Sequence, residues 1–176
     1  MVAERRGLRG VRGARIAACG AMILTFVTSG CAWMSTAPAR SGRVVQVLDG
    51  DTIVVDAVGT VRYLGIDTPE LHHPRKPVER FAARAAAANR AMVDGREVTL
   101  VTDREERDAY GRLLAYVYVG KVMVNAELMR GGYAESFAFA PNTLHRDLFD
   151  QLEQEARDAH RGQWGPLEGG PPYGLP

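Results

Sequence analysis

The sequence predicts an α+β, mainly β, domain in which a small closed barrel of five strands is accompanied by three helices. Three observations lead to this prediction. Short runs of alternating, β-branched residues recur at close spacing over residues 43–66 and again over 98–119. Turn signals rich in Gly and Asp separate these runs. Segments with apolar residues at helical spacing lie between and after the strands.

The predicted strands are short, and each is bounded by turn residues such as Asp49-Gly50-Asp51 and Val58-Gly59-Thr60. They cover residues 43–48, 52–55, 61–66, 98–101 and 113–119. The last two strands are joined by a charged loop over residues 103–112. Five short strands with a helix between them favour a closed barrel of the OB type.

The three predicted helices cover residues 78–93, residues 125–130, and a final segment that starts at the N-cap signal Asn142-Thr143 and stops at Gly162. The first helix is rich in alanine, which suits close packing on a sheet. In the last helix, side chains four residues apart are expected to form the buried stripe, namely Leu144, Leu148, Leu152 and Ala156. Trp164, just beyond that helix, is expected to pack back on the core.

The first 39 residues have the features of an export signal. Five arginines and one acid precede a mostly apolar run over residues 16–27, which has signal-peptide proportions and is short for a membrane span. Ala37-Pro38-Ala39 fits a small-x-small cleavage site that would start the mature chain at Arg40. Alternatively, small residues before Cys31 resemble a lipoprotein cleavage site, and a lipid on Cys31 would anchor the domain. A permanent N-terminal anchor is the third interpretation.

We therefore predict three regions: a signal peptide or lipoprotein leader over 1–39, a folded domain over 40–166 and a flexible Gly/Pro-rich tail over 167–176. Every interpretation of the leader places the domain outside the cytoplasm, either secreted or on the outer face of the cytoplasmic membrane.

Residues 40–176 hold 17 basic and 20 acidic residues, a net charge of −3. Any nucleic-acid partner must therefore be held by a local site, not by a basic surface. A monomer is the default expectation.

Four carboxylates, Asp49, Asp51, Asp67 and Glu70, stand where predicted strands end. In a small barrel such junctions can converge on one rim, where carboxylates repel one another unless a cation joins them. Oxygen ligands of this kind suit Ca²⁺ or Mg²⁺ and not zinc. Considered alone, the Asp-Gly-Asp sequence is more often a simple hairpin turn. The adjacent His72 and His73 are interpreted as loop residues and not as metal ligands.

Two arginines, Arg62 and Arg112, complete an inventory of charged groups. Each alone would be an ordinary side chain on a solvated face. Together with the carboxylates they match a chemistry, because two carboxylates can hold a hard cation and two guanidinium groups can bracket a phosphate. A further carboxylate can orient water. Hydrolysis of a phosphodiester requires these groups.

The order of these residues resembles that of the staphylococcal nuclease (thermonuclease) family. The resemblance rests on three motifs in sequence, DGDTI at residues 49–53, RYLGIDTPE at 62–70 and DAYGR at 108–112. Smaller matches, ending with Trp164, extend it over nearly all of residues 43–165. The resemblance implies an OB-fold barrel with three helices. It also implies a Ca²⁺-dependent nuclease that acts on DNA and RNA and leaves 3′-phosphate ends.

The resemblance also implies a role for each matched position. Asp51 and Asp67 would bind Ca²⁺ through their carboxylates and Thr68 through its backbone carbonyl, with Asp49 near the ion and not on it. The catalytic residues would be the two that contact the scissile phosphate and the one that holds the attacking water, namely Arg62, Arg112 and Glu70. Tyr110 would bind a phosphate oxygen through its hydroxyl.

Phe137 and Phe139 stand where the family prototype carries two tyrosines near the nucleotide base. Phenylalanine keeps base stacking but loses a hydroxyl. Because stacking requires unpaired bases, single-stranded or frayed substrates are expected.

Two other hypotheses for the function stay open. One is a non-catalytic OB-fold module that binds single-stranded nucleic acid; scaffolds of that kind would be expected to lose the Arg or Glu positions. The other is a surface-tethered structural lipoprotein, which rests on Cys31 alone.

Overall fold

The computed structural model describes residues 40–71 and 81–166. The predictions for the leader, the Gly/Pro-rich tail, His72 and His73 lie outside these residues. Within the described part of the chain, no helix has the length and apolarity that a membrane span requires.

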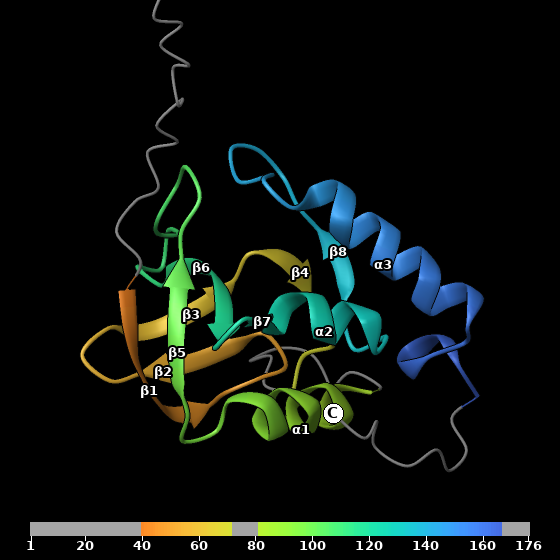
Figure 1. The fold of residues 1–176 in the computed structure, drawn as a ribbon, viewed down its shortest axis with the longest axis horizontal. Helices are drawn as coiled ribbons and strands as arrows, with labels where there is room; N and C mark the ends of the chain where they lie inside the picture. The colour runs from red at the N-terminus through yellow and green to blue at the C-terminus, as the bar shows by residue number, and fades with distance from the viewer. Residues whose placement is uncertain (1–39, 72–80, 167–176) are drawn as a thin grey trace, which may run out of the picture. The chain divides into compact units, whose positions relative to one another are not determined.

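A closed barrel of five strands forms the centre of the domain (Figure 1). Its strands are β1 (Arg40–Val47), β2 (Thr52–Val55), β3 (Gly59–Tyr63), β5 (Glu97–Val101) and β6 (Leu113–Val119). They pair in the order β3-β2-β1-β5-β6, and a parallel β3–β6 pairing closes the barrel. This arrangement confirms the predicted OB-type, mainly β fold with three helices.

Strand β1 is longer than predicted because it serves two partners. Its first half, Arg40–Arg43, pairs with β5, whereas residues from Val44 to Val47 pair with β2. The register shifts between Val44 and Gln46, which marks an irregularity of the β-bulge kind. Such a bulge bends a strand, so one strand can take part in both sides of a barrel.

The predicted single strand over residues 61–66 is wrong, because the chain turns at Gly65, which has φ +75°. Strand β3 ends at Tyr63, and a separate strand β4 (Gly65–Asp67) pairs with β8 (Glu135–Phe137), which was not predicted. A Cβ atom at Gly65 would lie 2.5 Å from the ring of Phe149, so glycine is required for close approach as well as for backbone conformation. The turn places β8, with Phe137, beside the carboxylate-bearing segment.

The three helices are α1 (Ala82–Val93), α2 (Val124–Arg130) and α3 (Arg146–Asp158). A short strand β7 (Val122–Met123) and a 3-10 turn η1 (Gly162–Trp164) were not predicted. Phe81, expected inside the first helix, precedes it with φ 78°. The last helix begins at Arg146 and ends at Asp158, short of Gly162. Its second half packs as predicted, but its start does not.

The predicted buried stripe of α3 is wrong at its first two positions, because Leu144 is 58% and Leu148 is 38% exposed. Phe149, together with Leu152 and Ala156, is buried instead. The helix therefore presents a face rotated toward Phe149, whose ring fits against Gly65. Trp164 does not enter the core: it is half-buried, and the guanidinium carbon of Arg157 lies 3.6 Å from its ring centroid.

Candidate active site

The centre of the candidate site is the guanidinium group of Arg62, which bonds to two carboxylates. Its Nη1 atom is ion-paired with Asp51, and its Nη2 atom donates to Asp67 Oδ1 at 2.5 Å. Strand β3 carries Arg62, the turn before β2 carries Asp51, and the end of β4 carries Asp67. The Asp51 side chain is 2% exposed, so its charge depends on this partner. Arg62 is thus not an ordinary side chain on a solvated face.

Asp51 also fixes the segment that follows β4. The backbone N–H of Thr68 donates to Asp51 Oδ2 at 2.9 Å, and the Thr52 hydroxyl donates to Asp51 Oδ1 at 3.0 Å. Gly50 permits this contact, since a Cβ there would lie 2.6 Å from Thr68 Oγ1. The three proposed cation-binding residues are therefore held together before any cation is considered.

Asp49 also helps to hold the segment after β4 against the turn that carries Asp51. Its carboxylate accepts hydrogen bonds from the backbone N–H of Leu71, at 3.3 and 3.2 Å, and from that of Gly50 at 2.9 Å. Glu70 precedes Leu71 and is half-buried. Asp49 thereby ties the end of the segment that carries Glu70 to the turn that carries Asp51.

A second pair of charges lies on the loop between β5 and β6. Asp108 accepts from Arg112 Nε at 2.6 Å and, through its other oxygen, from the backbone N–H groups of Arg112 and Tyr110 at 2.9 and 3.0 Å. Partial burial raises the pKa of Asp108, but hydrogen bonds from Arg112 and Tyr110 outweigh it and lower that pKa below its usual value. Asp108 thus fixes the direction of Arg112, whose guanidinium carbon lies 5.6 Å from the Tyr110 ring centroid.

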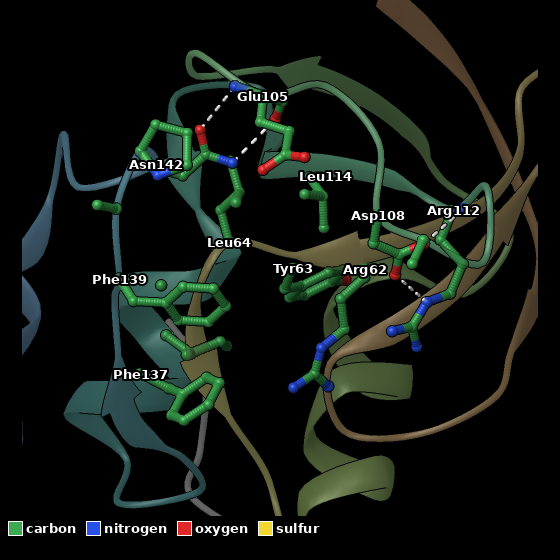
Figure 2. A pocket seen from close by; sticks show the side chains of 15 residues that line it. Arg62, Tyr63, Leu64, Glu105, Asp108, Arg112, Leu114, Phe137, Phe139 and Asn142 are labelled. Carbon is green, nitrogen blue, oxygen red and sulfur yellow. Dashed lines mark hydrogen bonds and ion pairs between the residues drawn. The ribbon is translucent and has the colours of Figure 1, made fainter.

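A pocket of about 360 Å³ brings the two arginines together with the two phenylalanines. Figure 2 shows Arg62 and Arg112 on one side of it and Phe137 and Phe139 on the other. The phenylalanine rings meet edge to face at 5.3 Å, and they are 54% and 64% exposed. Apolar side chains, among them Leu64 and Leu114, form the wall between the two sides. An anionic group and a flat apolar ring would both find partners here.

Some of the predicted site residues line the pocket, and others connect to it through the side chains that they contact. Arg62, Arg112, Phe137 and Phe139 line the pocket. Asp51 and Asp67 join them through Arg62, and Thr68 joins through Asp51. Tyr110 is 86% exposed, and it joins the site through its ring, which lies by the Arg112 guanidinium, and its backbone N–H, which donates to Asp108. Glu70 lies in the same segment as Thr68 but is not among the side chains that line this pocket.

Buried asparagines that sequence reasoning did not assign to the site hold its parts in place. Asn89, in α1, donates to the backbone carbonyl of Asp49 at 3.0 Å and accepts from the Tyr63 hydroxyl at 2.8 Å. Burial raises the pKa of that hydroxyl, partly offset by the bond to Asn89, so it remains a donor. Asn125 bridges Leu64 and Val117 in the same manner. The sequence feature that could have pointed to Asn89 is the presence of a polar asparagine within an alanine-rich predicted helix.

The proposed cation site is chemically suited to a hard ion. Within residues 40–71 and 81–166, no three His, Cys, Asp or Glu side chains are grouped to hold a metal. Two carboxylates, Asp51 and Asp67, with the Thr68 carbonyl would therefore supply only part of a coordination shell. Calcium accepts carbonyls and waters as additional ligands, whereas structural zinc requires four nitrogen or sulfur ligands. The Thr68 hydroxyl, buried without a hydrogen-bond partner in the described residues, is a further oxygen at this place.

Comparison with known proteins decides the family. Residues 60–166 match the family described as staphylococcal nuclease homologue. The chain belongs to the staphylococcal nuclease family. It is 35% identical over 136 residues to the thermonuclease of Staphylococcus hyicus, covering 76% of this chain and 80% of that protein. The thermonuclease of Staphylococcus intermedius is 38% identical over 128 residues, covering 71% and 76%.

A third relative is named for its activity as an endonuclease. Endonuclease YncB of Bacillus subtilis is 40% identical over 124 residues, which covers 68% of this chain and 59% of that protein. As a member of the staphylococcal nuclease family, with relatives named thermonuclease and endonuclease, the chain is a phosphodiester hydrolase.

Proposed function

We propose that this nuclease is a Ca²⁺-dependent enzyme that acts outside the cytoplasm on DNA and RNA and leaves 3′-phosphate ends. The observation that best supports the proposal is the shared guanidinium of Arg62, which joins Asp51 and Asp67 at the edge of a pocket that also holds Arg112. Opposite charges are thus gathered where a phosphodiester would need both a cation and positive donors.

Asp51, Asp67 and the Thr68 carbonyl would hold the Ca²⁺ ion. When bound, the ion would supply positive charge that offsets the growing negative charge on the phosphate. Nucleases of this family depend on metal ions in general, and hard oxygen ligands favour Ca²⁺ over transition metals. Because both carboxylates now bond to Arg62, a cation that binds them would compete for the same oxygens. Its binding would leave the Arg62 guanidinium available for a phosphate oxygen.

Arg62 and Arg112 would bind the scissile phosphate from the same side of the pocket. Planar guanidinium groups match phosphate oxygens with two parallel hydrogen bonds, and they stabilise the added charge of the transition state. Asp108 holds Arg112 in its direction in advance, which reduces the reorganisation needed during the reaction. Tyr110 would add a hydroxyl donor to a phosphate oxygen.

Glu70 would orient the attacking water and accept one of its protons. The water oxygen forms a bond to phosphorus as the bond from phosphorus to the 5′ oxygen breaks, and the leaving 5′ oxygen takes up a proton. The products are a 3′-phosphate and a 5′-hydroxyl. The bond between Asp49 and the Leu71 N–H supports this role, because it restrains the backbone next to Glu70.

The substrate would be single-stranded or frayed nucleic acid. Phe137 and Phe139 are exposed beside the phosphate-binding side of the pocket. Bases can stack on such rings only when they are unpaired, and stacking contributes ~1–3 kcal/mol per base in single-strand binders. A requirement for unpaired bases therefore follows from the aromatic side of the pocket.

The cellular location rests on the predicted leader. Export with cleavage after Ala39 would release a soluble enzyme, whereas lipidation of Cys31 would tether it to the outer face of the membrane. Mass spectrometry of the mature N-terminus distinguishes a free Arg40 from a diacylglyceryl Cys31. We expect the released or tethered enzyme to act as a monomer.

A single assay tests the proposed function. The purified protein is incubated with heat-denatured DNA in Ca²⁺ and, in parallel, in EDTA, and the product ends are identified. We expect shortening of the DNA with Ca²⁺, none with EDTA, and 3′-phosphate ends. If EDTA changes nothing, calcium dependence is refuted. If the strand is bound but keeps its length, the chain is the non-catalytic binding module instead.

A further inference from the structure

We propose that Glu105 hydrogen-bonds to the edge of the base that stacks on Phe137 and Phe139. The pocket would then favour bases with amino donors, guanine, adenine and cytosine, over thymine and uracil. The inference rests on the proposed function, because it assigns the pocket to a nucleotide. It adds a base preference to a site otherwise described only by phosphate binding and stacking.

Glu105 is held firmly at the rim of this pocket although its side chain is exposed. The side chain of Asn142 binds the Glu105 backbone twice, accepting from its N–H at 2.8 Å and donating to its carbonyl at 2.9 Å. Asn142 itself is 6% exposed and follows Phe139 by three residues. The amide therefore fixes the position of Glu105 relative to the segment that carries the aromatic rings.

The carboxylate of Glu105 is available to a ligand. Within residues 40–71 and 81–166 it has no hydrogen bond or ion pair, since both bonds of this residue are made by its backbone. Figure 2 shows the carboxylate directed toward the interior of the pocket, between Asn142 and Leu114. Arg112, which also lines the pocket, bonds to Asp108 and does not neutralise Glu105.

Other lining groups offer little competition for a base edge. Apolar side chains make up much of the remaining lining, among them Leu64, Ile66 and Leu114. The amide of Asn142 is occupied by the Glu105 backbone, and the Tyr63 hydroxyl donates to Asn89. A base stacked on the phenylalanines, with its phosphate at the arginines, would have the Glu105 carboxylate as its one free directional partner among these residues.

The chemistry of the base edges gives the order of preference. A carboxylate accepts hydrogen bonds but donates none. Guanine presents two adjacent donors on its pairing edge, and adenine and cytosine each present an amino group. Thymine and uracil present one N–H between two carbonyl oxygens, and those oxygens repel a carboxylate. The expected order is guanine first, then adenine and cytosine, and thymine or uracil last.

The test uses single-stranded oligothymidylates in which one internal thymidine is replaced by cytidine, adenosine or guanosine. Cleavage next to the substituted position is compared with cleavage at the remaining thymidines of the same strand. In the wild-type protein we expect cleavage at the substituted position to be enhanced about tenfold or more, the discrimination of one good hydrogen bond to a charged group. Glu105→Gln, which can both donate and accept, should reduce the enhancement to less than threefold, as should Glu105→Ala.

Glu97→Gln is the matched control, because Glu97 is an exposed residue of β5 that does not line the pocket. It removes the same charge and should keep the full enhancement. Uniform cleavage along the strand by the wild-type protein would refute the role of Glu105 while leaving the nuclease intact. A preference that persists in both Glu105 variants would refute it as well. A wild-type protein that cleaves none of the strands would instead refute the proposed function.

Discussion

The two sides of the pocket are built in opposite ways. On the carboxylate side, Asp51 is buried and bonds to both Arg62 and the Thr68 N–H, and Arg62 bonds in turn to Asp67. On the aromatic side, Phe137 and Phe139 are more than half exposed, and their rings meet edge to face. Charged groups that must match a transition state need fixed positions, whereas a stacking surface works with loosely held rings. The difference predicts that substitutions on the two sides change different kinetic constants.

The largest effect is expected on the carboxylate side. Arg62→Ala should lower kcat by ~10²–10³ or more, because it removes an oriented donor to the transition state. Glu70→Gln and Arg112→Ala should cause losses of the same order. The measurement is hydrolysis of denatured DNA at saturating Ca²⁺. If Arg62→Ala lowers kcat by less than tenfold, the carboxylate side does not control kcat in the way that this comparison of the two sides requires.

Arg62→Lys sharpens this test. Lysine keeps the charge but loses the planar fork that can donate two parallel hydrogen bonds to phosphate oxygens. We expect Arg62→Lys to recover only a small part of the activity lost in Arg62→Ala. Full recovery would mean that charge alone, without the fork geometry of the guanidinium, is sufficient.

A second, smaller effect is expected for Asn89, whose hydrogen bonds hold the turn that begins with Asp49. Asn89→Ala should lower the free energy of unfolding by roughly 2–4 kcal/mol, because it leaves the Asp49 carbonyl and the Tyr63 hydroxyl without their partner. Urea unfolding measures the change. Gln154→Ala, at an exposed position of α3, is the control and should stay within about 0.5 kcal/mol of wild type. Equal stability of the two variants would contradict the anchoring role of Asn89.

A third effect belongs to the aromatic side. Phe139→Ala should raise KM for denatured DNA about 5- to 150-fold, which corresponds to the ~1–3 kcal/mol of one stacked base. Its kcat should change much less than that of Arg62→Ala. Phe139→Tyr keeps the ring and should stay near wild type in KM. A Phe139→Ala protein that loses kcat with KM unchanged would reverse the assignment of the two sides.

The smallest effect is a dependence on pH at Asp108. Its pKa is lowered in the folded protein because the hydrogen bonds from Arg112 and Tyr110 outweigh its partial burial. A lowered pKa stabilises the fold above the usual carboxyl pKa, and the stabilisation is lost as pH falls through the lowered value. Asp108→Asn should therefore be less stable than wild type at pH 6, and the difference should shrink toward pH 3. Urea unfolding at both pH values measures it, and a difference that grows in acid would contradict the ion pair.

Much of the site could be predicted because its residues follow strands and carry family motifs. Asp51, Arg62 and Asp67 were placed together from sequence, and the structure joins them. The catalytic, cation-binding and substrate-binding roles of all these residues remain predictions, because the contacts show where the side chains lie and not how they act. Local pattern could not reveal that residues 61–66 are two strands, since only the tertiary contact of Gly65 with Phe149 requires the turn.

The errors have a common physical cause. Leu144 and Leu148 have the right spacing for a buried stripe, but α3 begins later and buries Phe149 instead. Asn142 was expected to cap this helix, yet its side chain bonds to Glu105 on a distant loop. In both cases a long-range contact prevails over a local preference, and single-sequence patterns carry no information on such contacts.

The central claim is that Asp51 and Asp67 form one calcium site with the shared Arg62 beside it. Calorimetric titration of the full protein with Ca²⁺ tests it most directly, using Asp51→Asn, Asp67→Asn and the control Glu97→Gln. We predict at least a tenfold weaker affinity in each aspartate variant and an unchanged affinity in the control. Wild-type affinity retained in both aspartate variants would contradict the account.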